Sequence, residues 1–198
     1  MKRVLSIILT IIFMLSISGI SAFAGSDLPI IDIGSFKVTA VTVSQSYAAY
    51  GESVTVTAKI SGNSTVSSAA LKLAYGADVI TVPMTYDSST KICECTFTVD
   101  DSFNLGEWST KSLFMNNKST ATISTSIKKS FTVVKYGDIN NDNRVNSTDA
   151  LLVLQKVVGN YSFSDAQVYA ANVNKDSKIS SYDALQILMF SVGEIDKF

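Results

Sequence analysis

The sequence predicts two modules, an all-β module of about a hundred residues followed by a small all-α module. Two patterns predict this order. From about Phe36 to Val134, apolar side chains alternate with Ser and Thr, which is the period of half-buried strands. After Gly137 a pattern rich in Asp and Asn occurs twice, 34 residues apart, and each copy leads into apolar residues at helical spacing.

The first residues have the composition of a segment that directs secretion. Two basic residues precede an apolar run, Val4–Ile20, and the run is followed by Ala22-Phe23-Ala24, a small-x-small cleavage pattern. We therefore predict a signal peptide at residues 1–24 and a short N-terminal segment at 25–35. The mature protein is expected to be secreted and to have no membrane span.

Four stretches between residues 52 and 99 alternate apolar and polar side chains, so each predicts a strand with one inward-facing row. The inward rows are Val54, Val56, Ala58 and Ile60; Ala69, Leu71, Leu73 and Tyr75; Ile80, Val82, Met84 and Tyr86; and Cys93, Cys95, Phe97 and Val99. Further strands are expected at Lys37–Val43, Trp108–Met115 and within Thr120–Val134. About seven short strands separated by turns predict an immunoglobulin-like sandwich over residues 36–135, resembling modules of bacterial surface proteins.

Two kinds of side chain in this module allow more than one interpretation. Cys93 and Cys95 lie on the same face of one strand, where a direct disulfide would be strained, so we interpret them as small buried apolar residues rather than redox or metal groups. Trp108 is the only tryptophan and fits the core of a sandwich. Alternatively, Trp108, Tyr47 and Tyr50 are exposed and stack on sugar rings.

Composition argues against several functions. The chain has no histidine, which removes His-dependent nucleophiles and His-ligated zinc. It has 16 Lys and Arg against 17 Asp and Glu, so the basic face of a nucleic-acid binder is not expected. Glycosidases need two flanking carboxylates, and the acidic residues of the β-rich part form no recognisable motif. We therefore expect no enzyme; a small glycoside-active enzyme is the weakest alternative.

Each Asp- and Asn-rich copy has the spacing of a twelve-residue calcium loop. Oxygen-bearing side chains occupy positions 1, 3, 5, 9 and 12, and position 7 supplies a backbone carbonyl. The expected ligands of two Ca²⁺ ions are Asp138, Asn140, Asp142, Arg144, Asn146 and Asp149 in loop one, and Asn172, Asn174, Asp176, Lys178, Ser180 and Asp183 in loop two. Loop one carries three carboxylates and loop two only two, so the second site is expected to bind more weakly.

A helix is expected after each loop. In the first, Ser147 or Thr148 is placed to cap the helix, and Leu151, Leu154 and Val158 recur on one face, as in an amphipathic helix. The second is expected from Ser181 to Val192 and is followed, as the first is, by a glycine. A short connecting helix is expected at Ser164–Ala171.

These loops differ from the usual EF-hand, since no helix enters the first loop and position 12 is Asp rather than Glu. A duplicated loop-helix unit of this kind, over residues 137–195, resembles the dockerin family. The resemblance implies folding on two calcium ions and docking onto a cohesin module of a scaffoldin, in extracellular or cell-surface complexes that degrade polysaccharide, such as cellulosomes. Partner-reading positions of the family correspond to Ser147, Thr148, Leu154 and Gln155 in copy one and to Ser181, Tyr182, Leu188 and Met189 in copy two.

Two roles are open for the β-rich module. Val134-Lys135-Tyr136-Gly137 leaves almost no linker, which favours a structural companion held close to the dockerin-like part. The alternative is a carbohydrate-binding module that brings polysaccharide as a second partner.

Overall fold

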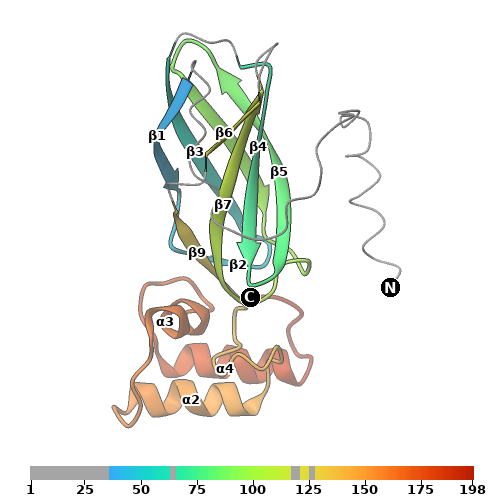
Figure 1. The fold of residues 1–198 in the computed structure, drawn as a ribbon. Helices are drawn as coiled ribbons and strands as arrows, with labels where there is room; N and C mark the ends of the chain where they lie inside the picture. The colour runs from blue at the N-terminus through green and yellow to red at the C-terminus, as the bar shows by residue number, and fades with distance from the viewer. Residues whose placement is uncertain (1–35, 63–65, 117–120, 125–127) are drawn as a thin grey trace, which may run out of the picture.

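The computed structural model describes residues 36–62, 66–116, 121–124 and 128–198. Within them, nine strands form a β-module and three helices follow it (Figure 1). The strands are β1 Phe36–Val43, β2 Tyr47–Ala49, β3 Ser53–Gly62, β4 Ser68–Tyr75, β5 Asp78–Asp87, β6 Ile92–Thr98, β7 Gly106–Asn116, β8 Ala121–Ser124 and β9 Ser130–Val134. The helices are α2 Ser147–Val157, α3 Asp165–Ala171 and α4 Ser181–Ser191. The predicted signal peptide and N-terminal segment lie outside the described residues.

The strands are joined in the order β1-β3-β6-β5-β4-β7-β9-β2, and β8 pairs with β7. Strand β5 belongs to both halves of this path, because Asp78–Met84 pairs with β4 whereas Thr85–Asp87 pairs with β6. The pairs are antiparallel except β2 with β9. The predicted β-rich class is therefore confirmed, whereas the specifically immunoglobulin-like arrangement stays a prediction.

The alternation read from the sequence matches the burial of the strands. Val54, Val56, Ala58 and Ile60 of β3 are buried, with polar side chains between them, and one core cluster joins residues of both halves of the strand path. Cys93 and Cys95 are buried free thiols, and burial raises the pKa of each to about 11. Such thiols are poorly nucleophilic at neutral pH, so they pack as small apolar residues.

Trp108 lies at the centre of this core and is 1% exposed. Its indole Nε1 donates a hydrogen bond to the carbonyl oxygen of Asn104 at 2.9 Å, and its ring lies 4.9 Å from that of Phe103. The interpretation of Trp108 as a sugar-stacking platform is therefore wrong. Half-buried Tyr50 is also engaged in the core, since its hydroxyl donates to the carbonyl oxygen of Phe103 at 2.9 Å.

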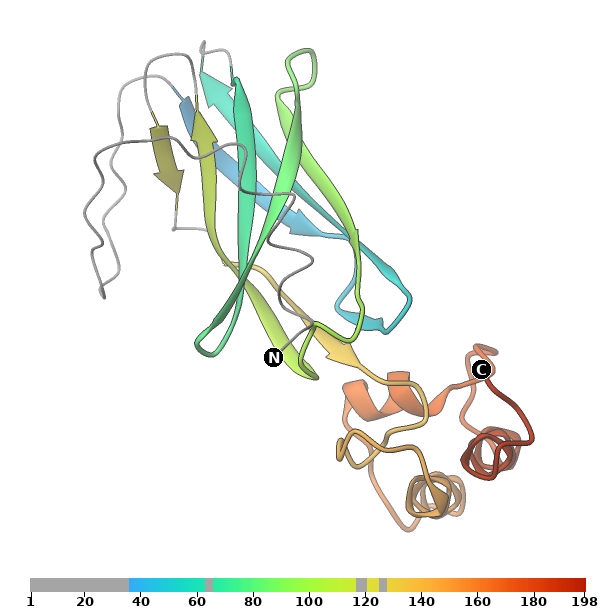
Figure 2. The same cartoon turned by 90° about the vertical axis from the view of Figure 1, so that its right-hand side faces the viewer.

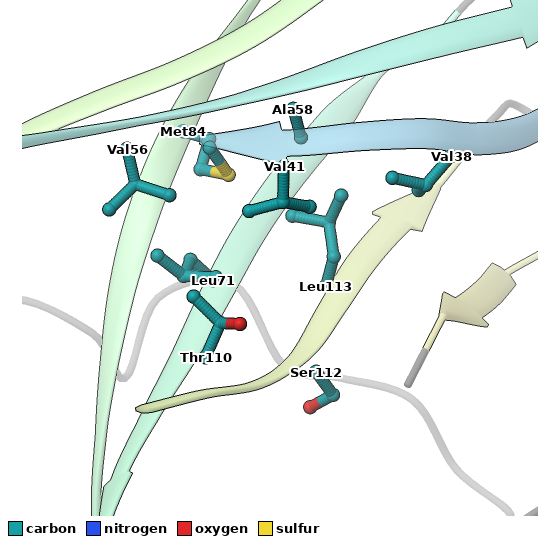
Figure 3. A pocket seen from close by; sticks show the side chains of 9 residues that line it. All are labelled: Val38, Val41, Val56, Ala58, Leu71, Met84, Thr110, Ser112 and Leu113. Carbon is teal, nitrogen blue, oxygen red and sulfur yellow. The ribbon is translucent and has the colours of Figure 1, made fainter. Parts of the chain in front are cut away.

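A small cavity of about 10 Å³ lies within the β-module. Figure 3 shows the hydroxyl side chains of Thr110 and Ser112 on one side of it, with apolar side chains completing the lining. This volume is about what one water molecule requires, so the cavity is too small for a sugar or a lipid chain.

The helical module, residues 137–198, packs below one end of the β-module in Figure 1. Helices α2 and α4 pack against each other, and α3 lies between them and the β-module, where it contacts β2 and β9 (Figures 1 and 2). The connecting helix predicted at Ser164–Ala171 is confirmed, with Ser164 as its N-cap. In the described part of the chain, no helix has both the length and the apolar character needed to cross a bilayer.

Replacing Trp108 with alanine is expected to destabilise the β-module by about 3–5 kcal/mol, because the substitution leaves a large cavity and an unpaired carbonyl. Urea unfolding followed by circular dichroism measures this. Val79→Ala is the control, because Val79 is 41% exposed on β5 and its loss should stay within about 0.5 kcal/mol. If Trp108→Ala lowered the free energy of unfolding by less than about 1 kcal/mol, this side chain would not have the central role in the core that its burial indicates.

Candidate functional site

Loop one folds around the carboxylate of Asp138, which is 4% exposed. Its Oδ1 accepts a hydrogen bond from the backbone N–H of Asp142 at 3.1 Å, and its Oδ2 accepts from that of Asn143 at 2.8 Å. The carboxylate of Asp142 in turn accepts from the backbone N–H of Arg144 at 2.8 Å. These short-range bonds turn the chain of loop one back on itself.

The aspartate at position 12 closes each loop onto its own beginning. Asp149 is fully buried, and its Oδ1 accepts from the backbone N–H groups of Ile139 and Asn140 at 2.9 and 3.2 Å. Asp183, also fully buried, accepts from the N–H of Asn174 at 3.4 Å. Each of these side chains belongs to the first turn of a helix, so the start of the loop is tied to the helix that follows it.

Both loops have the same backbone conformation at positions 4 and 6. Asn141 and Asn143 in loop one have φ of 60° and 69°, and Lys175 and Ser177 in loop two have φ of 59° and 73°. Asn adopts this left-handed region readily, whereas Lys and Ser seldom do, so loop two carries more backbone strain. The sequence duplication is therefore also a duplication of the loop geometry.

Position 9 of each loop supplies the side chain that caps the next helix. Asn146 and Ser180 accept hydrogen bonds from the backbone N–H groups of Thr148 and Tyr182, at 2.7 and 3.2 Å. The Asp three residues after each cap bonds back to the backbone of the cap residue, which completes a capping box. The prediction that Ser147 or Thr148 caps the first helix is therefore wrong, because the cap is Asn146, one or two residues earlier.

The charges of loop one oppose one another in the absence of a cation. Burial raises the pKa of the Asp138 carboxyl, and the charges of Asp149 and Asp142 raise it further, so it lies above its ordinary value despite bonds from loop amides. The pKa of exposed Asp142 is lowered, first by a hydrogen bond from the Asn140 side chain. Three carboxylates in one loop are therefore stabilised by a positive ion.

Calcium fits the oxygen donors of both loops. Among the described residues, no three carboxylate, thiol or imidazole side chains converge as a ready-made metal cluster. Loop two has only two carboxylates, so it must draw its remaining ligands from Asn and Ser side chains and backbone carbonyls. At its first position, the Oδ1 atom of Asn172 is buried and has no hydrogen-bond partner. A buried unpaired oxygen is costly, and a hard cation bound by the predicted ligands would satisfy it.

The outer faces of α2 and α4 carry exposed apolar side chains at matching positions. They are Leu151, Leu154 and Val158 on and just after α2, and Leu185, Leu188 and Val192 on and just after α4, each pair 34 residues apart and between 37% and 71% exposed. We call this set the apolar stripe. The apolar face predicted for the first helix therefore faces solvent. The side chains that α2 and α4 bury against each other lie on a different face of each helix and are Ala150, Val153, Ala184 and Ile187.

The eight predicted partner-reading residues lie on the same two helices. Ser147, Thr148 and Leu154 are exposed in copy one, as are Ser181, Tyr182 and Leu188 in copy two, whereas Gln155 and Met189 are half-buried. Four members of the apolar stripe, Leu151, Val158, Leu185 and Val192, were not predicted as partner-reading residues. The sequence does contain a signal for them, since these apolar residues recur at helical spacing and at the 34-residue offset of the two copies.

The two modules meet at the carboxylate of Glu52, a residue that precedes β3. Its Oε1 accepts from the hydroxyl of Tyr136 at 2.8 Å, and its Oε2 accepts from the hydroxyl of Tyr169 at 2.8 Å and the backbone N–H of Ala49 at 2.9 Å. Burial raises the pKa of Glu52, but these hydrogen bonds together with the charge of Lys175 outweigh it, so the pKa lies below its ordinary value. Sequence reasoning considered Glu52 only as one of several unplaced acidic residues.

A groove of about 620 Å³ opens at this junction. It is lined by both modules, with Tyr47 and Glu52 on one side and Tyr136, Tyr169 and Lys175 on the other. The ring of Tyr169 lies 5.7 Å from that of Tyr47 and 5.8 Å from that of Tyr136, measured between centroids. Of the three aromatic residues predicted for sugar stacking, only Tyr47 therefore lines a groove of ligand size.

Calcium titration by isothermal calorimetry is expected to resolve two unequal sites, because loop two has one carboxylate fewer than loop one. Asn172→Asp restores that carboxylate and should tighten the weaker site by roughly tenfold. Asn160→Asp, an exposed position after α2 and outside both loops, is the control and should change neither site. Two equal sites in the unsubstituted chain would contradict the assignment.

Solved structures similar to this chain have low sequence identity to it. Cwp6 from Clostridium difficile is 14% identical, covering 47% of this chain and 14% of that one, with a TM-score of 0.38. The sporulation control protein Spo0M from Bacillus subtilis is 15% identical, covering 62% and 56%, with a TM-score of 0.38. A Niemann-Pick type C2 protein from the Japanese carpenter ant is 12% identical, covering 54% and 100%, with a TM-score of 0.33. TM-scores this low do not establish a shared fold, and this chain spans less than two thirds of each of the first two structures.

No curated protein matches the chain. A family model does match its C-terminal part and agrees with the geometry described above, namely two closed loops, each followed by a capped helix. Type I dockerins bind calcium, and a dockerin domain implies a cohesin partner. Residues 136–189 match the dockerin type I domain.

Proposed function

We propose that this chain is a secreted, non-catalytic component of a polysaccharide-degrading multi-enzyme complex, attached through its helical module to a cohesin of a scaffoldin. The match of residues 136–189 to the type I dockerin domain supports cohesin docking in complexes of the cellulosome kind. The observation that carries the proposal is the apolar stripe, which repeats at the same 34-residue offset as the calcium loops.

The apolar stripe has the character of a protein-binding surface. Leu151 and Leu185 are 53% and 49% exposed, and Val158 and Val192 are 68% and 71% exposed. Large apolar side chains exposed at matching positions of two neighbouring helices are costly in water unless a partner covers them. The hydroxyls of exposed Ser147 and Ser181 lie at the start of the same helices and supply polar contacts at the rim.

The loops hold the two helices in the arrangement that presents this surface. Bound calcium would supply a positive charge that offsets the repulsion among the carboxylates of Asp138, Asp142 and Asp149. Hydrogen bonds within the chain fix the position of each helix, because Asp149 and Asp183 tie each helix to the start of its loop. Docking should therefore depend on calcium.

The two copies present different side chains to a partner. Thr148 in copy one corresponds to the larger Tyr182 in copy two, and Gln155 corresponds to Met189. A cohesin that fits one copy would meet a different shape and polarity on the other. We therefore propose that the copies are not interchangeable and that one of them provides most of the contact.

Support for a non-catalytic β-module comes from Glu52. Both of its carboxylate oxygens already accept hydrogen bonds from the chain, at 2.8 to 2.9 Å. A carboxylate held in this way acts as a structural anchor, and its lowered pKa disfavours the role of the general acid that a glycosidase needs. The β-module is proposed to act as the structural companion of the dockerin-type part.

Docking is tested by measuring the affinity of the full chain for a panel of cohesins in calcium. Leu154→Asp combined with Leu188→Asp should weaken binding by about 100-fold or more, because charge is introduced into both copies of the apolar stripe. The two single variants should differ, and the more damaging one identifies the copy that makes most contact. Val79→Asp, an exposed apolar position on the β-module, is the matched control. Failure of every cohesin to bind the unsubstituted chain would overturn the proposal.

A second candidate function is saccharide binding at the junction groove. It is favoured by the three tyrosine rings of Tyr47, Tyr136 and Tyr169, which line a groove of about 620 Å³ next to the carboxylate of Glu52. Clefts of this size at domain junctions, with aromatic walls and few polar groups, are typical ligand sites. Sugar rings present apolar faces that stack on aromatic side chains.

Saccharide binding is tested by sedimenting the full chain with insoluble cellulose, starch or xylan. Tyr47→Ala is expected to weaken retention by about tenfold, since it removes one stacking surface and no hydrogen bond to Glu52. Tyr161→Ala is the control, because Tyr161 is 42% exposed on the helical module and away from the groove lining. Equal retention of the Tyr47→Ala variant, or no retention of the unsubstituted chain, would exclude this function.

A further inference from the structure

We propose that the β-module and the calcium loops form one thermodynamic unit, in which Glu52 couples calcium binding by the helical module to the stability of the β-module. The proposal rests on calcium binding by the two loops and adds to the docking function a regulation of the whole chain by calcium. It is carried by four contacts that meet within the junction Lys135–Gly137.

The junction is bonded to loop one. The Nζ atom of Lys135 donates to the backbone carbonyl oxygen of Asn143, at position 6 of that loop, at 2.8 Å. Gly137 immediately precedes the first ligand, Asp138, and has φ of 80°. A side-chain carbon at Gly137 would lie 2.9 Å from Val145 of the same loop, so the chain can enter loop one this closely only through glycine.

The same junction is in contact with loop two and with α3. The Nζ atom of Lys175, at position 4 of loop two, lies 4.7 Å from the centroid of the Tyr136 ring. The backbone N–H of Gly137 donates to the carbonyl oxygen of Ala170 in α3 at 2.9 Å. Ordering of either loop therefore reduces the conformational freedom of Tyr136 and Gly137.

Glu52 links the ordered junction to the β-module, because it is hydrogen-bonded to both. The backbone N–H of Glu52 donates to Ala49 at 3.0 Å, and its carbonyl oxygen accepts from Val99 at 2.8 Å, so the residue is fixed within the β-module on both sides. Its side chain holds the hydroxyls of Tyr136 and Tyr169, which come from the junction and from α3. Removing the folded helical module would leave this carboxylate without two of its three side-chain hydrogen bonds.

Apolar packing accompanies these polar contacts. Ala49 of β2, Val134 of β9 and Ala170 of α3 form a buried cluster, with Tyr136 and Tyr169 packed against it. Ala49 is fully buried, and Val134 and Ala170 are 6% and 2% exposed. Unfolding of α3 would expose this cluster to water, which would lower the stability of the β2–β9 edge.

By thermodynamic reciprocity, a coupling of this kind acts in both directions. If calcium-loaded loops stabilise the β-module, then an intact Glu52 contact must raise the apparent calcium affinity by the corresponding factor. Couplings between sites in proteins commonly correspond to roughly 5- to 150-fold in affinity.

The only tryptophan, Trp108, lies in the core of the β-module and reports on that module alone. The test is a thermal melt of the full chain followed by Trp108 fluorescence, in calcium and in excess chelator, with helix content followed by circular dichroism in parallel. Chelation is expected to lower the Trp108 midpoint by about 4 °C or more in the unsubstituted chain. In Glu52→Ala this shift should shrink, and calcium affinity measured by calorimetry should fall at least about fivefold.

Tyr169→Phe removes one hydroxyl from the contact and leaves the ring in place, so it should reproduce part of both effects even if Glu52→Ala folds poorly. Glu94→Ala, an exposed position on β6, is the matched control and should leave both effects unchanged. A calcium-dependent helix signal with a Trp108 midpoint indifferent to chelator would overturn the coupling while leaving calcium binding and docking intact. Absence of any calcium response in either signal would overturn the coupling together with the calcium-dependent part of the proposed function.

Discussion

The structure of the helical module depends on one constraint, the closure of each loop by a buried aspartate that belongs to the following helix. Asp149 and Asp183 are the fully buried charged residues of this module. At the other end of its loop, Asp149 accepts hydrogen bonds from two backbone N–H groups and Asp183 from one. Because the same residues complete the capping boxes of α2 and α4, loop closure and the start of each helix are one event. Without this closure, the first turn of each helix would no longer be tied to the start of its loop.

The way α2 and α4 pack explains why so much apolar surface is left outside. Their contact uses Ala150 and Ala184, together with Val153 and Ile187, and small residues allow two helices to approach closely. A narrow contact of this kind uses one strip of each helix. Larger side chains on the adjoining strip, such as Leu151 and Leu185, then have no intramolecular neighbour to cover them.

Local patterns predicted much of the fold, since alternation and spacing are properties of neighbouring residues. The strand rows containing Val54 and Cys93, the connecting helix and the duplicated loops were all predicted from the sequence. Strand β2 was missed because its three residues, Tyr47–Ala49, are too few to show a period and pair in parallel with a strand far along the chain.

Other features escaped prediction because they depend on contacts between distant residues. Helical spacing indicated an apolar face on α2, but only packing against α4 determines which face is buried. Glu52 is 84 residues from Tyr136 and 117 from Tyr169, so no local signal connects them. Trp108 fitted both interpretations until its burial was known, since spacing alone did not determine its face.

Strand β9 has a mechanical consequence for a protein held by its helical module. The strand runs directly into the junction (Figure 2). It pairs with β2, which is parallel to it, and with β7, which is antiparallel. Tension applied through a captured helical module would enter along β9, across the direction of its inter-strand hydrogen bonds. Those bonds would then carry the load together, in shear, instead of opening one after another from an end. Under such a load, the β2–β9 and β7–β9 pairs would separate only if several of these hydrogen bonds broke at once.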